Sequence, residues 1–251
     1  VMPRLRFRRR DANGEPSEQE ESSDDGLEIE ITAPNVFNYP PEDGGLVDAW
    51  FDTLSNEWIY VTGYEAWHGW TGTHWQRDET LYILFQLEEM IHAMNIQARK
   101  ATAKAKMDGD ENKEKAFRVY VVSTKRSRAR VMSVEALAEP KRARSAAMLD
   151  TGNALNLLNG TLDLDTLTLR EHHRADMLTY TLPYAYDFYA PCPRFKQFIS
   201  EVLVKTDGKT PDPELALLAQ ELVGYSLTQD TNQEAMVWLA GEGGNGKTVM
   251  I

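Results

Sequence analysis

The chain has 251 residues, enough for one or two domains with a sizeable core. With 42% hydrophobic and 26% charged residues, its composition is that of a globular protein rather than a collagen, a coiled coil or a wholly disordered chain. Cys192 is the only cysteine, which excludes an internal disulfide and argues against a thiolate zinc site. Without a long apolar run or a signal peptide, we expect a cytoplasmic protein in a reducing compartment with no membrane partner.

The first 45 residues are predicted to form a disordered tail or linker. They open with five arginines, at positions 4, 6, 8, 9 and 10, and then turn acidic from Glu15 to Asp25. Few apolar side chains lie in this stretch, so burial would not offset the entropy that is lost on ordering. A folded domain is therefore expected to begin at Leu46.

Aromatic residues are dense directly after this point. Five tryptophans fall within 26 residues: Trp50, Trp58, Trp67, Trp70 and Trp75. The pattern of residues 57–75, with turns at Gly63 and Gly72, predicts a small antiparallel meander. Because no Lys or Arg lies among the rings before Arg77, they favour core packing over base stacking. His68 and His74 have no acidic or cysteine partner at ligand spacing, and we interpret them as packing or surface residues.

A long amphipathic helix is predicted over residues 79–107. Asp78 can serve as its N-cap, and apolar side chains recur every three or four residues from Leu84 to Ala98. Residues 117–122 have strand propensity but neighbours that favour helix, so their type stays open at this point.

Positive charge is concentrated between Arg99 and Arg144, although the whole chain carries a net charge of −12. This segment holds fourteen Lys or Arg and six Asp or Glu. Such a segment can neutralise phosphates inside an acidic protein, but a solvated helical face explains it equally well. The candidate nucleic-acid contacts are its most closely spaced basic residues: Lys125, Arg126, Arg128, Arg130, Lys141, Arg142 and Arg144.

The C-terminal part combines a hairpin, two helices and an apolar strand. Asn159-Gly160 between two alternating runs predicts a β-hairpin that continues to Leu169. Helices are predicted over residues 194–204, with Phe195 among the buried side chains, and over 213–223, ending at Gly224. The apolar run of residues 235–240 suits a parallel strand that is buried on both faces.

A complete phosphate-loop motif follows this predicted strand. Its residues are Gly241, Glu242, Gly243, Gly244, Asn245, Gly246, Lys247 and Thr248. The glycines allow backbone N–H groups to point at phosphate oxygens, and a helix that starts near Gly246 adds the positive end of its dipole. Lys247 is predicted to act on the β- and γ-phosphates of ATP, and Thr248 to ligate Mg²⁺. A glycine-rich loop without nucleotide is the alternative.

Four segments resemble the phage and plasmid primase-helicases and occur in the same order. They are LNLLNGTLDL at residues 155–164, CPRF at 192–195, LVGYSLT at 222–228 and GGNGKT at 243–248. The chain is similar to the middle of these proteins, where a helical domain shared with poxvirus primase-helicases leads into a superfamily 3 helicase domain.

This resemblance implies a ring-forming, hexameric translocase of the AAA+ class that binds ATP and Mg²⁺ and unwinds DNA. It also implies that the Walker B acids, the polar sensor and the arginine finger follow beyond Ile251. On that basis the chain is expected to be truncated just after the phosphate loop and to hydrolyse no ATP alone.

The predicted fold class is α+β, largely helical with small antiparallel hairpins, ending in the first strand and P-loop of an α/β ATPase domain. The expected parts are a tail over residues 1–45, a helical, wing-like domain over 46–210 and the start of the ATPase over 211–251. The predicted partners are DNA and further copies of the chain. Two alternatives stay open: a P-loop NTPase of another class, and a non-enzymatic DNA-binding or oligomerisation module.

Overall fold

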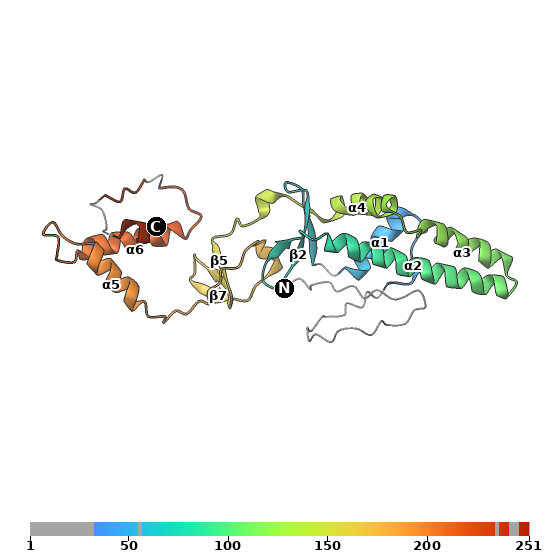
Figure 1. Cartoon of the computed structure of the whole chain (residues 1–251), viewed down its shortest axis with the longest axis horizontal. Helices are drawn as coiled ribbons and strands as arrows, with labels where there is room; N and C mark the ends of the chain where they lie inside the picture. The colour runs from blue at the N-terminus through green and yellow to red at the C-terminus, as the bar shows by residue number, and fades with distance from the viewer. Residues whose placement is uncertain (1–32, 55–56, 234–235, 241–245, 251) are drawn as a thin grey trace, which may run out of the picture. The chain divides into compact units, whose positions relative to one another are not determined.

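The computed structural model describes residues 33–54, 57–233, 236–240 and 246–250, and these form an α+β protein, about half of it helical (Figure 1). The chain divides into two compact units. One comprises residues up to 71 together with 75–148, and the other comprises residues 72–74 and those from 149 onward. The boundary that was expected at residue 210 therefore lies inside the second unit.

The first unit combines a four-stranded sheet with helices. Its elements are a 3-10 helix η1 (Val36–Asn38), α1 (Asp43–Thr53), β1 (Trp58–Val61), β2 (Ala66–Trp70), β3 (Trp75–Arg77), α2 (Tyr82–Met107), α3 (Glu111–Ser123), α4 (Arg128–Arg142), β4 (Ala143–Arg144) and a 3-10 helix η2 (Ala146–Met148). The sheet order is β3-β2-β1-β4, in which β1, β2 and β3 are antiparallel and β4 runs parallel to β1. This confirms the predicted meander, with its third strand two residues later than expected.

The core of this unit lies between α1, α2, α4 and the sheet. Three of the five clustered tryptophans, Trp50, Trp58 and Trp67, are buried there, and the rings of Trp50 and Trp67 lie 5.7 Å apart. Val36 is only 1% exposed in the same core, and its backbone N–H donates to Gln97 Oε1 on α2 at 3.0 Å. The prediction of a tail to residue 45 is therefore wrong from residue 33 onward, because α2 supplies the apolar surface that the segment itself lacks. Residues 1–32 lie outside the described part.

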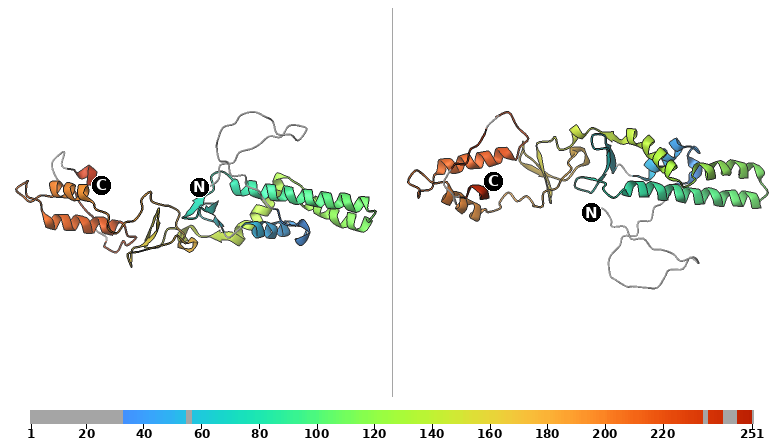
Figure 2. Two further views of the ribbon diagram at one scale, coloured as in Figure 1. Left: turned by 90° about the horizontal axis from the view of Figure 1, so that it is seen from below. Right: turned by 45° about the horizontal axis from the view of Figure 1, so that its top comes forward.

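Helices α2 and α3 lie side by side as a helical hairpin (Figure 2). The α2 helix starts three residues later than predicted, and its N-cap is Leu81, in the left-handed region, instead of Asp78. Asp78 still accepts from Ile83 N–H in the first turn at 2.9 Å. The connection places Gly109 at φ +72°, a conformation that glycine adopts without strain. Asp110 then accepts from Lys113 N–H at 3.0 Å, and this cap starts a helix through residues 117–122.

The second unit holds a three-stranded sheet followed by helices. Its elements are β5 (Ala154–Leu157), β6 (Gly160–Asp163), β7 (Thr168–Arg170), a 3-10 helix η3 (Arg174–Asp176), α5 (Pro193–Val202), α6 (Pro213–Ser226) and α7 (Lys247–Met250). The predicted hairpin is confirmed, but Leu157 pairs with Gly160, so the two turn residues are Leu158 and Asn159. Gly160 is required for another reason: its φ is +148°, and a Cβ there would lie 2.4 Å from the carbonyl oxygen of Arg170.

Three predictions for the C-terminal part are wrong. Phe195 is 49% exposed, because α5 is covered on one side only and buries Ile199 there. Helix α6 continues past Gly224 to Ser226. Residues 236–240 form no strand, and Trp238 is 83% exposed. An apolar run becomes a buried strand only when neighbouring strands satisfy its backbone, and no described strand pairs with this one.

Candidate nucleotide and nucleic-acid sites

The phosphate-loop motif is described only at its C-terminal end. Gly246 has φ +78°, and helix α7 begins directly after it at Lys247. A Cβ on Gly246 would lie 2.7 Å from Val202 Cγ1, so both the dihedral angle and the close approach require glycine. Gly241, Glu242, Gly243, Gly244 and Asn245 lie outside the described residues.

The described end of this motif has the helix start that the sequence predicts. The short helix α7 begins at Lys247, and the N–H groups of Val249 and Met250 donate to the carbonyl oxygen of Gly246 at 3.0 and 3.2 Å. The side chain of Thr248 is exposed, so its hydroxyl is accessible to a cation. The assignment of Lys247 and Thr248 to ATP and Mg²⁺ remains a prediction.

Two of the basic residues predicted to contact DNA hold the start of α4 against other helices. Arg126 Nε lies 2.8 Å from Glu88 Oε1 on α2, and a second nitrogen of this guanidinium lies 3.6 Å from Glu89. The hydrogen bond to Glu88 raises the pKa of Arg126. Arg130 forms an ion pair with Asp43 at the start of α1. Both guanidinium charges are thus paired with carboxylates of the protein. This is expected if these residues belong to a solvated helical face, the alternative to DNA binding.

The basic residues at the end of α4 are also engaged. Lys141 Nζ lies 3.0 Å from Asp48 Oδ1 on α1, and the guanidinium of Arg142 lies 4.6 Å from the centre of the Phe51 ring. Arg144 belongs to β4, and its carbonyl oxygen accepts from Thr62 N–H at 3.0 Å. The sequence grouped these residues by spacing alone, while the structure uses them to join α4 and β4 to α1 and β1.

Three of the predicted DNA contacts remain accessible. Lys125, Arg128 and Arg144 are exposed, and no described residue forms an ion pair with any of them. Four further basic residues, all on the second half of α2, share this property: Arg99, Lys100, Lys104 and Lys106. The sequence prediction did not include these four residues.

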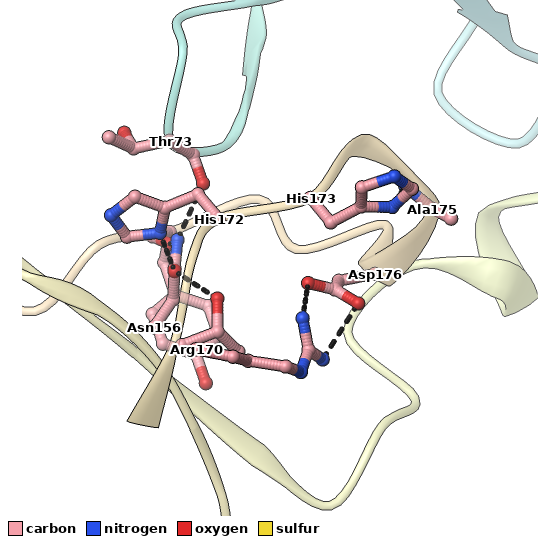
Figure 3. A network of polar contacts seen from close by, with 9 residues as sticks. Thr73, Asn156, Arg170, His172, His173, Ala175 and Asp176 are labelled. Carbon is pink, nitrogen blue, oxygen red and sulfur yellow. Dashed lines mark hydrogen bonds and ion pairs between the residues drawn. The ribbon is translucent and has the colours of Figure 1, made fainter. Parts of the chain in front are cut away.

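A buried polar network organises the second unit (Figure 3). The side chain of Asn156 is fully buried, and its Nδ2 donates to the carbonyl oxygens of Thr73 at 2.9 Å and Tyr180 at 2.7 Å. Its Oδ1 lies 3.1 Å from Thr161 Oγ1 and 2.8 Å from His172 Nδ1. The amide therefore ties together four separate segments of this unit.

Other residues of the LNLLNGTLDL segment also have structural roles. Asn159 clamps Tyr186, donating to its carbonyl oxygen at 2.9 Å and accepting from its N–H at 2.8 Å. Asp163 accepts from Thr166 N–H at 2.8 Å and closes the β6–β7 turn. Beside this sheet, Arg170 forms a two-point ion pair with Asp176, at 2.7 and 2.8 Å (Figure 3). The segment that carries much of the resemblance thus specifies the fold of the second unit.

His68 of the meander is a packing residue. His68 is buried, its Nδ1 lies 3.2 Å from the carbonyl oxygen of Ala66, and burial lowers the pKa of its ring. Across the described residues, no group of three or more His, Cys, Asp or Glu is arranged to hold a metal ion. In the same part of the chain, no helix combines the length and apolar character that crossing a bilayer requires.

Comparison with known families identifies the family of the chain. A family model described as D5 N-terminal-like matches residues 47–204, which covers most of the first unit and continues through α5 of the second. Domains of this family are associated with primase-helicase proteins. A search of curated proteins found no match. Since the family model matches more than half of the 251 residues, the chain belongs to the D5 N-terminal-like family.

Proposed function

We propose that the chain is part of an ATP-dependent DNA helicase of the primase-helicase type and that it binds ATP through residues 241–248. The observation that carries this proposal is the order of two features along one chain. A D5 N-terminal-like region over residues 47–204 is followed by a complete phosphate-loop motif, and a helix starts at Lys247 of that motif. The first feature supports the replication context, and the second supports use of a nucleoside triphosphate.

Both backbone and side-chain groups of the motif would bind the nucleotide. Backbone N–H groups of residues 241–246 would bind the phosphates, and the start of α7 would add its positive dipole end. Lys247 would place a positive charge near the β- and γ-phosphates. The Thr248 hydroxyl would ligate Mg²⁺, which would neutralise charge on the phosphate oxygens. By resemblance to superfamily 3, the ATP sites are shared between the subunits of a hexameric ring.

The first test is equilibrium binding of a fluorescent ATP analogue with and without Mg²⁺. Lys247→Ala should weaken binding by roughly 10- to 100-fold, because a charge-assisted contact contributes about 1.5–3 kcal/mol. Lys205→Ala is the matched control, since this exposed lysine lies outside the motif and hydrogen-bonds to the described residues through its backbone N–H and carbonyl groups. Thr248→Ala should remove the part of the affinity that depends on Mg²⁺.

Equal affinities of wild type and Lys247→Ala would refute ATP binding by the motif. In a helicase that contains this chain, the same substitution should abolish ATP-driven strand separation while the fold is kept. Retained unwinding by that variant would refute the role of the loop in the motor.

A further inference from the structure

The second half of α2 carries an unbalanced positive face. It consists of four exposed residues, Arg99, Lys100, Lys104 and Lys106, here called the α2 cationic face. No described residue forms an ion pair with any of them, and no Asp or Glu occurs between Met90 and Met107. These charges are therefore not neutralised on their own helix.

Helical geometry arranges the four side chains in two rows. At about 100° per residue, Arg99 and Lys106 lie along one edge of the face and Lys100 and Lys104 along the other, over about 10 Å of helix. The exposed Ala103 lies between the rows and offers no side-chain obstacle there. On the opposite side of α2, Ala98 and Ala105 are buried. The face is thus held outward by the packing of the helix that bears it.

The neighbouring acids do not neutralise this face. On α3, basic and acidic residues pair with each other along the helix: Lys113 with Asp110 at 3.0 Å, Lys115 with Glu111 at 4.0 Å and Arg118 with Glu114 at 3.5 Å. Arg126, just before α4, pairs with an acid of α2, and the described ion pairs of α4 itself go to acids of α1. Basic residues that serve only to solvate a helix are usually interspersed with acids in this manner, and the α2 cationic face is not.

We propose that the α2 cationic face binds the phosphate backbone of DNA. This inference rests on the proposed function for its partner, because the replication context makes DNA the polyanion that the protein meets. Four Lys and Arg side chains without a base-reading loop contact phosphates and carry no sequence information. Binding is therefore independent of sequence and of nucleotide, and it releases counterions, which makes it depend steeply on salt.

The test measures fluorescence anisotropy of a labelled duplex and of its single strand, without nucleotide. Four phosphate contacts predict a slope of log K against log salt of about −3.6 for duplex and −2.8 for single strand. Raising salt from about 50 to 200 mM should then weaken binding by about 150-fold and 50-fold, respectively. Replacing Arg99, Lys100, Lys104 and Lys106 together by Gln, a good helix former, should remove this component of the affinity and of the slope.

The matched control replaces the three paired cations of α3, Lys113, Lys115 and Arg118, by Gln. This variant changes the net charge of the same hairpin by nearly as much. Because those charges are already paired with acids, it should change the DNA affinity by less than a factor of about three and leave the salt dependence close to that of wild type. An equal loss in this control would show that only net charge matters and would overturn the proposal. Wild-type affinity in the α2 variant would overturn it too.

Two further measurements keep the result unambiguous. Far-UV circular dichroism checks the helicity of the quadruple variant, and if it unfolds, Lys104→Gln and Lys106→Gln singly should each reduce the slope by about 0.9. Polyglutamate that competes as well as DNA at equal charge would assign the face to an acidic protein and overturn the proposal. Because Lys247→Ala should leave DNA binding unchanged, failure of the nucleotide site and failure of the α2 cationic face are distinguishable.

Discussion

Replacing Asn156 by Ala should destabilise the β5–β6–β7 sheet by about 3 kcal/mol, because one fully buried amide bonds to four segments. The substitution removes its contacts to Thr73, Tyr180, Thr161 and His172, each between 2.7 and 3.1 Å. A hydrogen bond contributes about 1 kcal/mol net, and a buried partner that stays unpaired costs about 1–3 kcal/mol. Thr161 is buried, so its hydroxyl would stay unpaired in the variant, whereas the partly exposed partners can bond to water instead. The expected total loss of stability is therefore about 3 kcal/mol.

Hydrogen exchange of the β6 amides measures this effect within the second unit. A loss of about 3 kcal/mol corresponds to exchange about 150-fold faster under conditions in which the sheet closes faster than its amides exchange, so that the rate reports the opening equilibrium. Asn159→Ala is the comparison: that side chain is exposed and makes its two bonds to Tyr186 alone, so exchange should increase less than about tenfold. If Asn156→Ala exchanged as slowly as Asn159→Ala, the network would not stabilise the sheet and its role as described would be refuted.

Two further predictions concern one substitution in each unit. Burial raises the pKa of Glu135, against the opposing hydrogen bond from Trp67, so its contribution to stability is present below pH 4.5 and is lost as pH rises through the raised value. Glu135→Gln keeps the acceptor and should raise the melting temperature of the first unit at pH 7 but not at pH 4; an equal shift at both would contradict the assigned cause. Gly160→Ala should cost more than about 1 kcal/mol, because its Cβ would meet the Arg170 carbonyl at a positive φ. Gly152→Ala, with open space around it, should cost less, and equal denaturation midpoints would contradict the steric account.

Local patterns predicted those elements that depend on local chemistry. The meander, the hairpin at Asn159 and the long helix α2 follow from turn residues and periodicity, which act within a few residues. The same patterns failed where distant partners decide. Val36 is buried by α2, and its N–H bonds to Gln97, 61 positions away. Residues 236–240 have a strand's composition but no described neighbour to pair with.

The candidate sites show the same limit. Counting charges located the basic region correctly, but the acids that neutralise Arg130 and Lys141 lie on α1, about 90 residues earlier in the chain. Charge balance is therefore a property of the packed helices and cannot be obtained from a window of sequence. The predicted phosphate loop is the opposite case, because its expected chemistry depends on eight consecutive residues, and α7 begins where the sequence predicts a helix start.

The continuity of α2 links two regions of very different local stability. Its first half buries Leu87, Met90 and Ile91 in the core, so those backbone amides can open only when the whole unit unfolds. Beyond Ala98, whose side chain still lies in the core, the helix packs chiefly on α3, and we expect this end to open locally from the Gly109 turn. A ligand bound to this end of α2 should therefore slow hydrogen exchange of the amides near Gly109 and leave the amides of the first half unchanged. Hydrogen exchange along this one helix would thus detect binding.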